Sequence, residues 1–199
     1  MTNSQQLSLI RQGSQTWNTW RMAHPNLRVD LSYANLAGLN LRDINLADAQ
    51  LVSANLRNAD LSGANCRNAN LLDANLTNVN LSYGSLSFAN LVSATVNHAN
   101  LTQADCRGIR LANAVLKHAN GEAANFQNAN LSHTECGKSN FRRANLSGAN
   151  FWAANLTGAC LYEAQTSSQT NFSDVTWGNT VLPDGNVGDF SQSLKYKNA

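Results

Sequence analysis

The chain has 199 residues, 14 basic against 12 acidic side chains for a formal net charge of +2, and only 13% charged residues. This balance argues against an obligatory nucleic-acid groove, which concentrates positive charge, and also against a charge-driven disordered chain. No apolar stretch approaches the ~18 residues of a membrane span. The N-terminus lacks the basic and apolar regions of a signal peptide. We therefore expect a soluble, cytoplasmic protein that contacts no membrane.

Residues 1–28 are expected to form an α-helical cap. They contain two short helical patterns, the second over residues 14–23, separated by Gly13, which can stop a helix. The second pattern carries Trp17 and Trp20. Both ends of a repeat array expose apolar core and unpaired backbone. We interpret the two indoles as a plug on the first coil, and a partner-binding surface is the alternative.

Residues 29–166 repeat every five positions without an insertion. The centre of each unit, beginning at Leu31, is Leu in 19 of 28 units. The residue two places earlier is Ala in 20 units, and the residue just before the centre is Asn or Asp in 20. Neither the helical period of 3.6 nor the strand period of 2 explains this pattern. A large and a small inward residue in each unit would let the chain turn a corner and still fill a narrow core.

The units SANLR, ADLSG and GANFW match the A(D/N)LXX pattern of the pentapeptide repeat family, which the chain resembles over residues 29–182. The resemblance implies an all-β solenoid, a right-handed quadrilateral parallel β-helix in which four units close one square coil. Residues 20 apart then stack in columns with the sheet spacing of about 4.8 Å, so the seven coils would span about 35 Å. The frequent Asn before the centre is expected to bond to local backbone at the turns. Similar caps in the family point to a cyanobacterial origin.

The frame slips by one residue after position 166. It resumes at Phe172 and Trp177, so we interpret residues 167–185 as a phase-shifted final coil. The Pro-Asp-Gly sequence at its end predicts a turn that closes the array. Residues 186–199 are polar and are predicted to be a mobile tail.

Glycine and cysteine are among the residues that replace leucine at the centres. Gly121 leaves a void that we expect Phe126 and Phe141 to fill, and a small functional pocket is the alternative. Three cysteines also stand at centres, namely Cys66, Cys106 and Cys136. They are expected to be small buried hydrophobic residues. No CxxC pair is present, so zinc or thiol-exchange chemistry has no support and no metal or other cofactor is expected.

The residue after each centre points outward and forms four columns, one on each side of the coil. Three columns are polar or charged. The fourth is apolar through four consecutive coils and has a Trp two coils further on; its residues are Val52, Leu72, Val92, Ala112 and Trp152. A contiguous apolar patch often marks a contact site. We predict that these residues bind a protein partner or a second copy of the chain; cover by the tail, or chance surface residues, are the alternatives.

Another outward column holds His98 and His118, one coil apart, followed by Lys138. This spacing would let two imidazoles share a metal, but the lysine would repel a cation, so we interpret the column as a solvated basic strip. Two ion pairs between coils are also expected: Glu122 with Arg142, and Arg143 with Glu163.

The sequence favours a binding protein over an enzyme. It contains no Gly-rich phosphate loop and no nucleophile motif, and a convex rod offers no obvious cleft. We predict a non-enzymatic scaffold or regulatory protein that presents a flat face to a protein partner. The runner-up follows the branch of the family that mimics DNA and inhibits topoisomerase (gyrase). A DNA mimic needs excess negative charge, whereas residues 30–166 carry nine acidic and nine basic side chains. A self-assembling structural rod is the third possibility.

Overall fold

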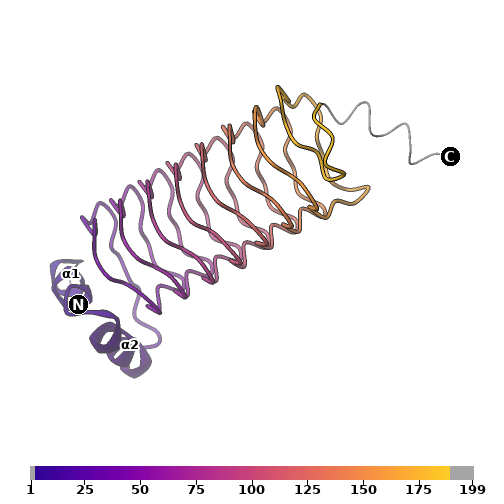
Figure 1. Cartoon of the computed structure of the whole chain (residues 1–199). Coiled ribbons are helices and arrows are strands. Elements are labelled where there is room, and N and C mark those ends of the chain that lie inside the picture. The colour runs from indigo at the N-terminus through magenta and orange to yellow at the C-terminus, as the bar shows by residue number, and fades with distance from the viewer. Residues whose placement is uncertain (1–2, 189–199) are drawn as a thin grey trace.

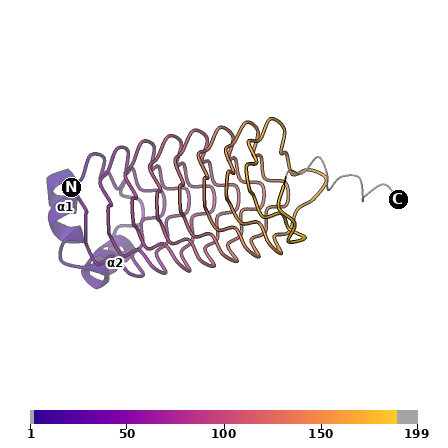
Figure 2. The ribbon, with the colours of Figure 1, turned by 45° about the horizontal axis from the view of Figure 1, so that its top comes forward.

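The computed structural model describes residues 3–188, which form an elongated rod with two helices at its N-terminal end (Figure 1). Helix α1 spans Asn3–Ile10 and helix α2 spans Ser14–Ala23. The rest of the rod is a stack of square coils, which Figure 2 shows from a second direction. From Asp30 to Gln165 its backbone pairing consists of isolated parallel bridges between residues twenty apart, such as Asn35 with Asn55. Four bridges per coil, one on each side, give the predicted quadrilateral β-helix.

Each corner of a coil is a turn that places one residue at positive φ. This angle is 61° at Tyr33 and 60° at Glu163, and every fifth residue between them is also positive. The turn closes when the N–H of Ala34 donates to the carbonyl of Leu31 at 3.1 Å, as in a type II turn. Positive φ is unfavourable for residues other than glycine. The same residue gains a bond in return, because the N–H of Tyr33 donates to Val52 in the next coil at 2.8 Å.

The asparagine that precedes most of the centres stabilises its corner in two ways. The Oδ1 of Asn55 accepts a hydrogen bond from the N–H of Arg57 at 3.2 Å, which confirms the predicted local bond to backbone. The Nδ2 of the same residue donates to Oδ1 of Asn35, one coil earlier, at 3.1 Å. Asn90 donates to Asn70 in the same way at 2.9 Å. Ladders of amides therefore join the coils in addition to the backbone bridges.

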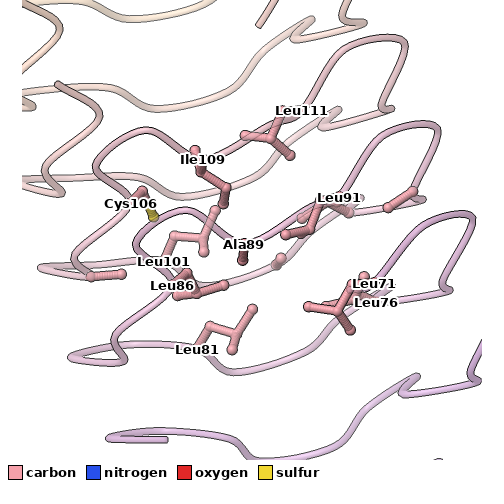
Figure 3. Packing of buried hydrophobic residues seen from close by; sticks show 14 of the residues in the cluster. Leu71, Leu76, Leu81, Leu86, Ala89, Leu91, Leu101, Cys106, Ile109 and Leu111 are labelled. Atoms are coloured by element: carbon pink, nitrogen blue, oxygen red, sulfur yellow. The ribbon is translucent and has the colours of Figure 1, made fainter. Parts of the chain in front are cut away.

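The interior of the rod is filled by the centre residues and the small residues two places before them. Leu71, Leu81, Leu91 and Ala89 are all at most 2% exposed, and Figure 3 shows how such side chains from successive coils meet inside the rod. The alternation of large and small side chains lets a coil of only twenty residues close around a continuous apolar core.

The void expected at Gly121 is filled by its aromatic neighbours. A Cβ on Gly121 would lie 3.0 Å from Cε2 of Phe126 and 3.3 Å from Cδ1 of Phe141. The two rings also contact each other edge to face, with centroids 5.5 Å apart. The missing leucine is therefore compensated by larger centres in the same and the following coil.

Helix α1 closes the first coil with a side-chain amide. The Nε2 of Gln6 donates to the carbonyl of Arg28 at 3.0 Å, and its Oε1 accepts from the N–H of Asp30 at 2.8 Å. In the middle of the rod, the backbone of the preceding coil provides donors and acceptors for the carbonyl and N–H groups of a coil. At this end, the side-chain amide of Gln6 provides one of each. Gln6 is only 2% exposed.

Helix α2 closes the adjacent part of the same end. Trp17 is fully buried, and its Nε1 donates to the carbonyl of Asn45 at 2.8 Å. Asn18 accepts from the N–H of Asn45 at 2.8 Å and donates to the carbonyl of Asp43 at 2.9 Å. Trp20 packs against the core as a partly buried residue. The interpretation of the two indoles as a plug is confirmed.

The last coil is out of register by one residue, as predicted. Asn150 pairs with Asn171, 21 positions later. The chain then reverses, and Val181 pairs antiparallel with Val187, which covers the edge that a further coil would use. Ordered chain thus continues beyond the boundary expected at residue 185. The remainder of the expected tail, residues 189–199, lies outside the described residues.

Replacing Gln6 by Ala leaves the N–H of Asp30 and the carbonyl of Arg28 without their partner at the end of the rod. We expect the free energy of unfolding to fall by about 1–3 kcal/mol. Gln15→Ala, at an exposed position of α2, is the matched control and should change it by less than about 0.5 kcal/mol. Urea denaturation measures both, and equal losses would contradict the capping role of Gln6.

Candidate functional site

The predicted contact residues Val52, Leu72, Val92 and Ala112, here called the apolar column, occupy the same corner position in four successive coils. Backbone bonds fix them in line. The N–H after Val52 donates to the carbonyl of Leu72 at 2.8 Å, and the N–H after Leu72 donates to the carbonyl of Val92 at 3.1 Å. All four side chains are partly exposed. At the coil spacing of about 4.8 Å they form a continuous apolar strip along one side of the rod.

Trp152 stands apart from the apolar column. Ser132, which is 8% exposed, separates it from Ala112. The indole of Trp152 is 44% exposed and packs edge to face on His133, with ring centroids 4.6 Å apart. Its Nε1 donates to Oδ2 of Asp174 at 2.8 Å. The contact with Asp174 does not follow from the five-residue frame, because the slipped register of the final coil decides where Asp174 lies. The tryptophan thus belongs to a small polar cluster at the C-terminal end.

Of the two ion pairs expected between coils, one is confirmed and one is wrong. The Nε of Arg143 contacts a carboxylate oxygen of Glu163 at 2.6 Å, and this hydrogen bond lowers the pKa of Glu163. The guanidinium of Arg142 does not pair with Glu122. It lies over the ring of Tyr162, 5.1 Å from the centroid, and its Nη2 is 3.9 Å from Glu163. Arginine is long enough to reach the aromatic ring in the following coil, where it keeps contact with solvent.

The two stacked histidines present no common metal geometry. The rings of His98 and His118 lie almost parallel, 3° apart in orientation, with centroids 4.8 Å apart. The nitrogen lone pairs of parallel rings lie in parallel planes and do not converge on one point. Within residues 3–188, no three His, Cys, Asp or Glu side chains are grouped so that they could hold a metal ion.

The cysteines at centre positions are inert by burial. Cys66, Cys106 and Cys136 are at most 1% exposed, and Cys160 is partly exposed. Loss of solvation raises the pKa of Cys66 and of Cys136 to about 12. The pKa of Cys106 is raised by the same cause, with a contribution from the charge of Asp105. These thiols therefore stay protonated at neutral pH and act as core side chains.

The surface of residues 3–188 has two hollows that concern the candidate site. One, of about 500 Å³, lies where the segment between α1 and α2 meets the first coil, and Arg11 and Arg42 are among its lining residues. The other, of about 320 Å³, lies on the side of the rod next to the apolar column, and Arg67, Phe88 and Arg107 are among its lining residues. Neither hollow could be predicted from the five-residue pattern of the sequence.

No helix in the described part of the chain has the length and apolar character needed to cross a membrane.

The sequence pattern and the square coils agree with a family model, that of the pentapeptide repeats, which matches residues 28–63, 59–97, 97–120 and 124–161. The chain belongs to the pentapeptide repeat family. Its fold is accordingly the right-handed quadrilateral β-helix of that family, and the recognition made from the sequence is confirmed. No curated protein matches this chain.

Solved structures of this family resemble the chain at low sequence identity. HetL, a protein involved in heterocyst differentiation regulation from the cyanobacterium Nostoc sp. strain PCC 7120, is 24% identical over 81% of this chain and 82% of its own, with a TM-score of 0.44. Rfr23 from the cyanobacterium Cyanothece 51142 is 22% identical over 80% and 99%, with a TM-score of 0.25. QnrB1, a plasmid-mediated fluoroquinolone resistance protein, is 12% identical over 83% and 92%, with a TM-score of 0.46. These likenesses concern the fold alone.

The buried thiols of this pentapeptide repeat protein predict a loss of stability at high pH. A thiol in an unfolded chain titrates near pH 8.5, whereas Cys66 and Cys136 keep their protons to about pH 12 in the folded protein. The unfolded state therefore loses protons first, and stability falls as the pH rises from about 8.5 towards 12. Each such thiol should lower the free energy of unfolding by about 1.4 kcal/mol per pH unit in that range.

Urea denaturation at pH 8 and pH 10 measures this effect. Cys66→Ala removes one of the titrating thiols and leaves the tyrosines unchanged, so the variant should lose less stability between the two pH values than the original chain. An identical loss would contradict the assignment of the pH dependence to the buried thiols.

Proposed function

We propose that this protein is a non-enzymatic scaffold that binds another protein through the apolar column. The observation that carries the proposal is the unbroken outward strip Val52, Leu72, Val92 and Ala112, on a rod whose other outward columns are polar or charged. Membership of a repeat family supports a binding role, because repeat rods present extended surfaces to partners.

The backbone of the rod makes the column a favourable contact surface. Each side chain of the strip stands at a corner whose backbone is bonded to the neighbouring coils. A partner therefore meets side chains that are already aligned, and little conformational entropy is lost on binding. Covering apolar area contributes about 25 cal/mol for each Å² removed from water. The polar columns on either side would form the rim that surrounds the apolar centre of such an interface.

The charge distribution supports this proposal over DNA mimicry. A protein that occupies a DNA-binding groove needs a strongly negative surface. Residues 30–166 carry nine acidic and nine basic side chains, and five ion pairs of the described residues neutralise some of them locally. A partner surface of apolar character fits the rod better than one built to hold a polyanion.

The double variant Leu72→Asp and Val92→Asp places two carboxylates in the middle of the apolar column. Burying them under a partner would be costly, so we expect the variant to lose the proteins that the tagged original chain captures from a lysate of its native cell. Thr77→Asp and Asn97→Asp add the same charges at the same positions of the same two coils on the next side of the rod. This control should retain the captured proteins.

Sedimentation velocity of the three purified proteins identifies the partner class. A dimer of the original chain and of the control, together with a monomer of the Leu72→Asp/Val92→Asp variant, would make a second copy the occupant of the column. Retention of all captured proteins and of the oligomeric state by that variant would overturn the proposal, and so would equal loss in variant and control.

A further inference from the structure

A second surface feature lies on the side of the rod next to the apolar column. It is the hollow of about 320 Å³, here called the arginine hollow, and it extends across four coils. Its lining residues are Arg67, Ser87, Phe88, Arg107, Gly108, Gln127 and Asn128. Three independent features of these residues are typical of a site for an anionic group that has an apolar group beside it.

The first feature is an aromatic ring held on the surface. The side chain of Phe88 is 60% exposed. It lies over the next coil because that coil has Gly108 at the equivalent position. A Cβ on Gly108 would lie 2.7 Å from both Cδ1 and Cε1 of Phe88, so a larger residue there would displace the ring. An exposed phenyl ring in a defined position offers a ready contact for an apolar group.

The second feature is a buried hydroxyl without a partner. At the same position in other units, the hydroxyls of Thr77, Ser82 and Thr102 donate to an asparagine Oδ1 two residues earlier, at 2.7–2.8 Å. In the unit of Ser87 that asparagine is replaced by Ser85. Ser87 is 1% exposed, and within residues 3–188 its Oγ has no hydrogen-bond partner. A buried donor of this kind is unfavourable until a partner reaches it.

The third feature is a pair of guanidinium groups. Arg67 and Arg107 stand in the same outward column, two coils apart, with Ser87 between them. Arg107 is oriented by Asp105, which accepts from its Nε at 2.8 Å and from its Nη2 at 2.7 Å. Arg67 is exposed and forms no ion pair with another described residue. With one carboxylate against two guanidinium groups, the arginine hollow keeps one net positive charge.

We propose that the arginine hollow binds the carboxylate of an acidic side chain of a protein partner. The carboxylate lies between Arg67 and Arg107 and accepts the hydrogen bond that the Ser87 hydroxyl has free. An apolar residue beside the acid then contacts the ring of Phe88. Charge-assisted bonds from guanidinium groups are the strong ones for a carboxylate. The inference rests on the proposed function in that the occupant is a protein, but it does not depend on the apolar column.

The extent of the positive charge favours a peptide over a nucleic acid. A bound strand needs a basic track that follows several phosphates. In the column of Arg67 and Arg107, the residues beyond the two arginines are Ala47 and Gln127, which are neutral. The site therefore matches one anionic group with one apolar neighbour.

A titration followed by NMR of the ¹⁵N-labelled full chain tests the inference. The probe is the peptide acetyl-Gly-Glu-Phe-Gly-amide, and the comparison peptide has Gln in place of Glu. We expect saturable shifts of the backbone amides of Ser87, Phe88 and Gly108 with the acidic peptide. The neutral peptide should bind at least about tenfold more weakly, because it lacks the charge that the guanidinium groups recognise.

Variants of the same chain separate recognition from folding. Arg67→Gln with Arg107→Gln should abolish the saturable shifts, whereas Arg42→Gln with Arg57→Gln removes the same charge from two other sides and should leave them unchanged. Ser87→Ala should keep or raise the melting temperature, since it deletes an unpartnered buried hydroxyl, and should still weaken the acidic peptide several-fold.

Four results would overturn the inference. They are an absence of shifts at the three amides, equal binding of the acidic and neutral peptides, equal loss in both double arginine variants, and tighter binding of a thymidine oligonucleotide than of the acidic peptide. Because no variant of the apolar column enters this experiment, its failure is distinguishable from failure of the proposed function.

Discussion

The whole rod depends on one turn that is repeated every five residues and places its third residue at positive φ. Asp, Tyr, His and Lys side chains all occupy this position, although positive φ is unfavourable for each of them. The conformation persists because it directs the residue's N–H to a carbonyl in the next coil, as Tyr33 does to Val52. Where an asparagine precedes the turn, as Asn55 does, its side chain adds a bond to backbone and a bond to the neighbouring coil. The energetic cost of the corner is thus offset by bonds within the turn and by bonds to the neighbouring coils.

This constraint also determines how the molecule can acquire function. A core of stacked leucines and alanines is similar in every coil, so a site arises only where a unit departs from the repeat. Ser85 replaces an asparagine and leaves the hydroxyl of Ser87 without its acceptor. Gly108 replaces a larger residue and lets Phe88 lie on the surface. The apolar column is a departure of another kind, because the same corner carries an apolar side chain in four consecutive coils, whereas the other columns carry polar ones.

The sequence predicts which residues point into the core and which coil each residue belongs to. It can do so because the five-residue frame runs through residues 29–166 in one register. The inward leucines, the fill at Gly121 and the slip before Phe172 all follow from counting residues. Contacts made by long side chains do not follow, since these can reach several neighbours. Arg142 therefore lies on Tyr162 rather than beside Glu122. The sequence does show that Ser85 stands where other units have an asparagine. Only the structure shows that Ser87 is buried, so the unpartnered hydroxyl of the arginine hollow could not be predicted from the sequence.

The twenty-residue coil can be tested most directly by deletion. Removing residues 82–101 takes out one complete coil and leaves every later unit in frame with the cap and the final coil. Removing residues 82–100 deletes one residue fewer and turns the later leucines out of the core. We expect the first protein to keep its far-ultraviolet circular dichroism and a cooperative thermal transition, and the second to lose both. Equal behaviour of the two proteins would contradict the twenty-residue coil.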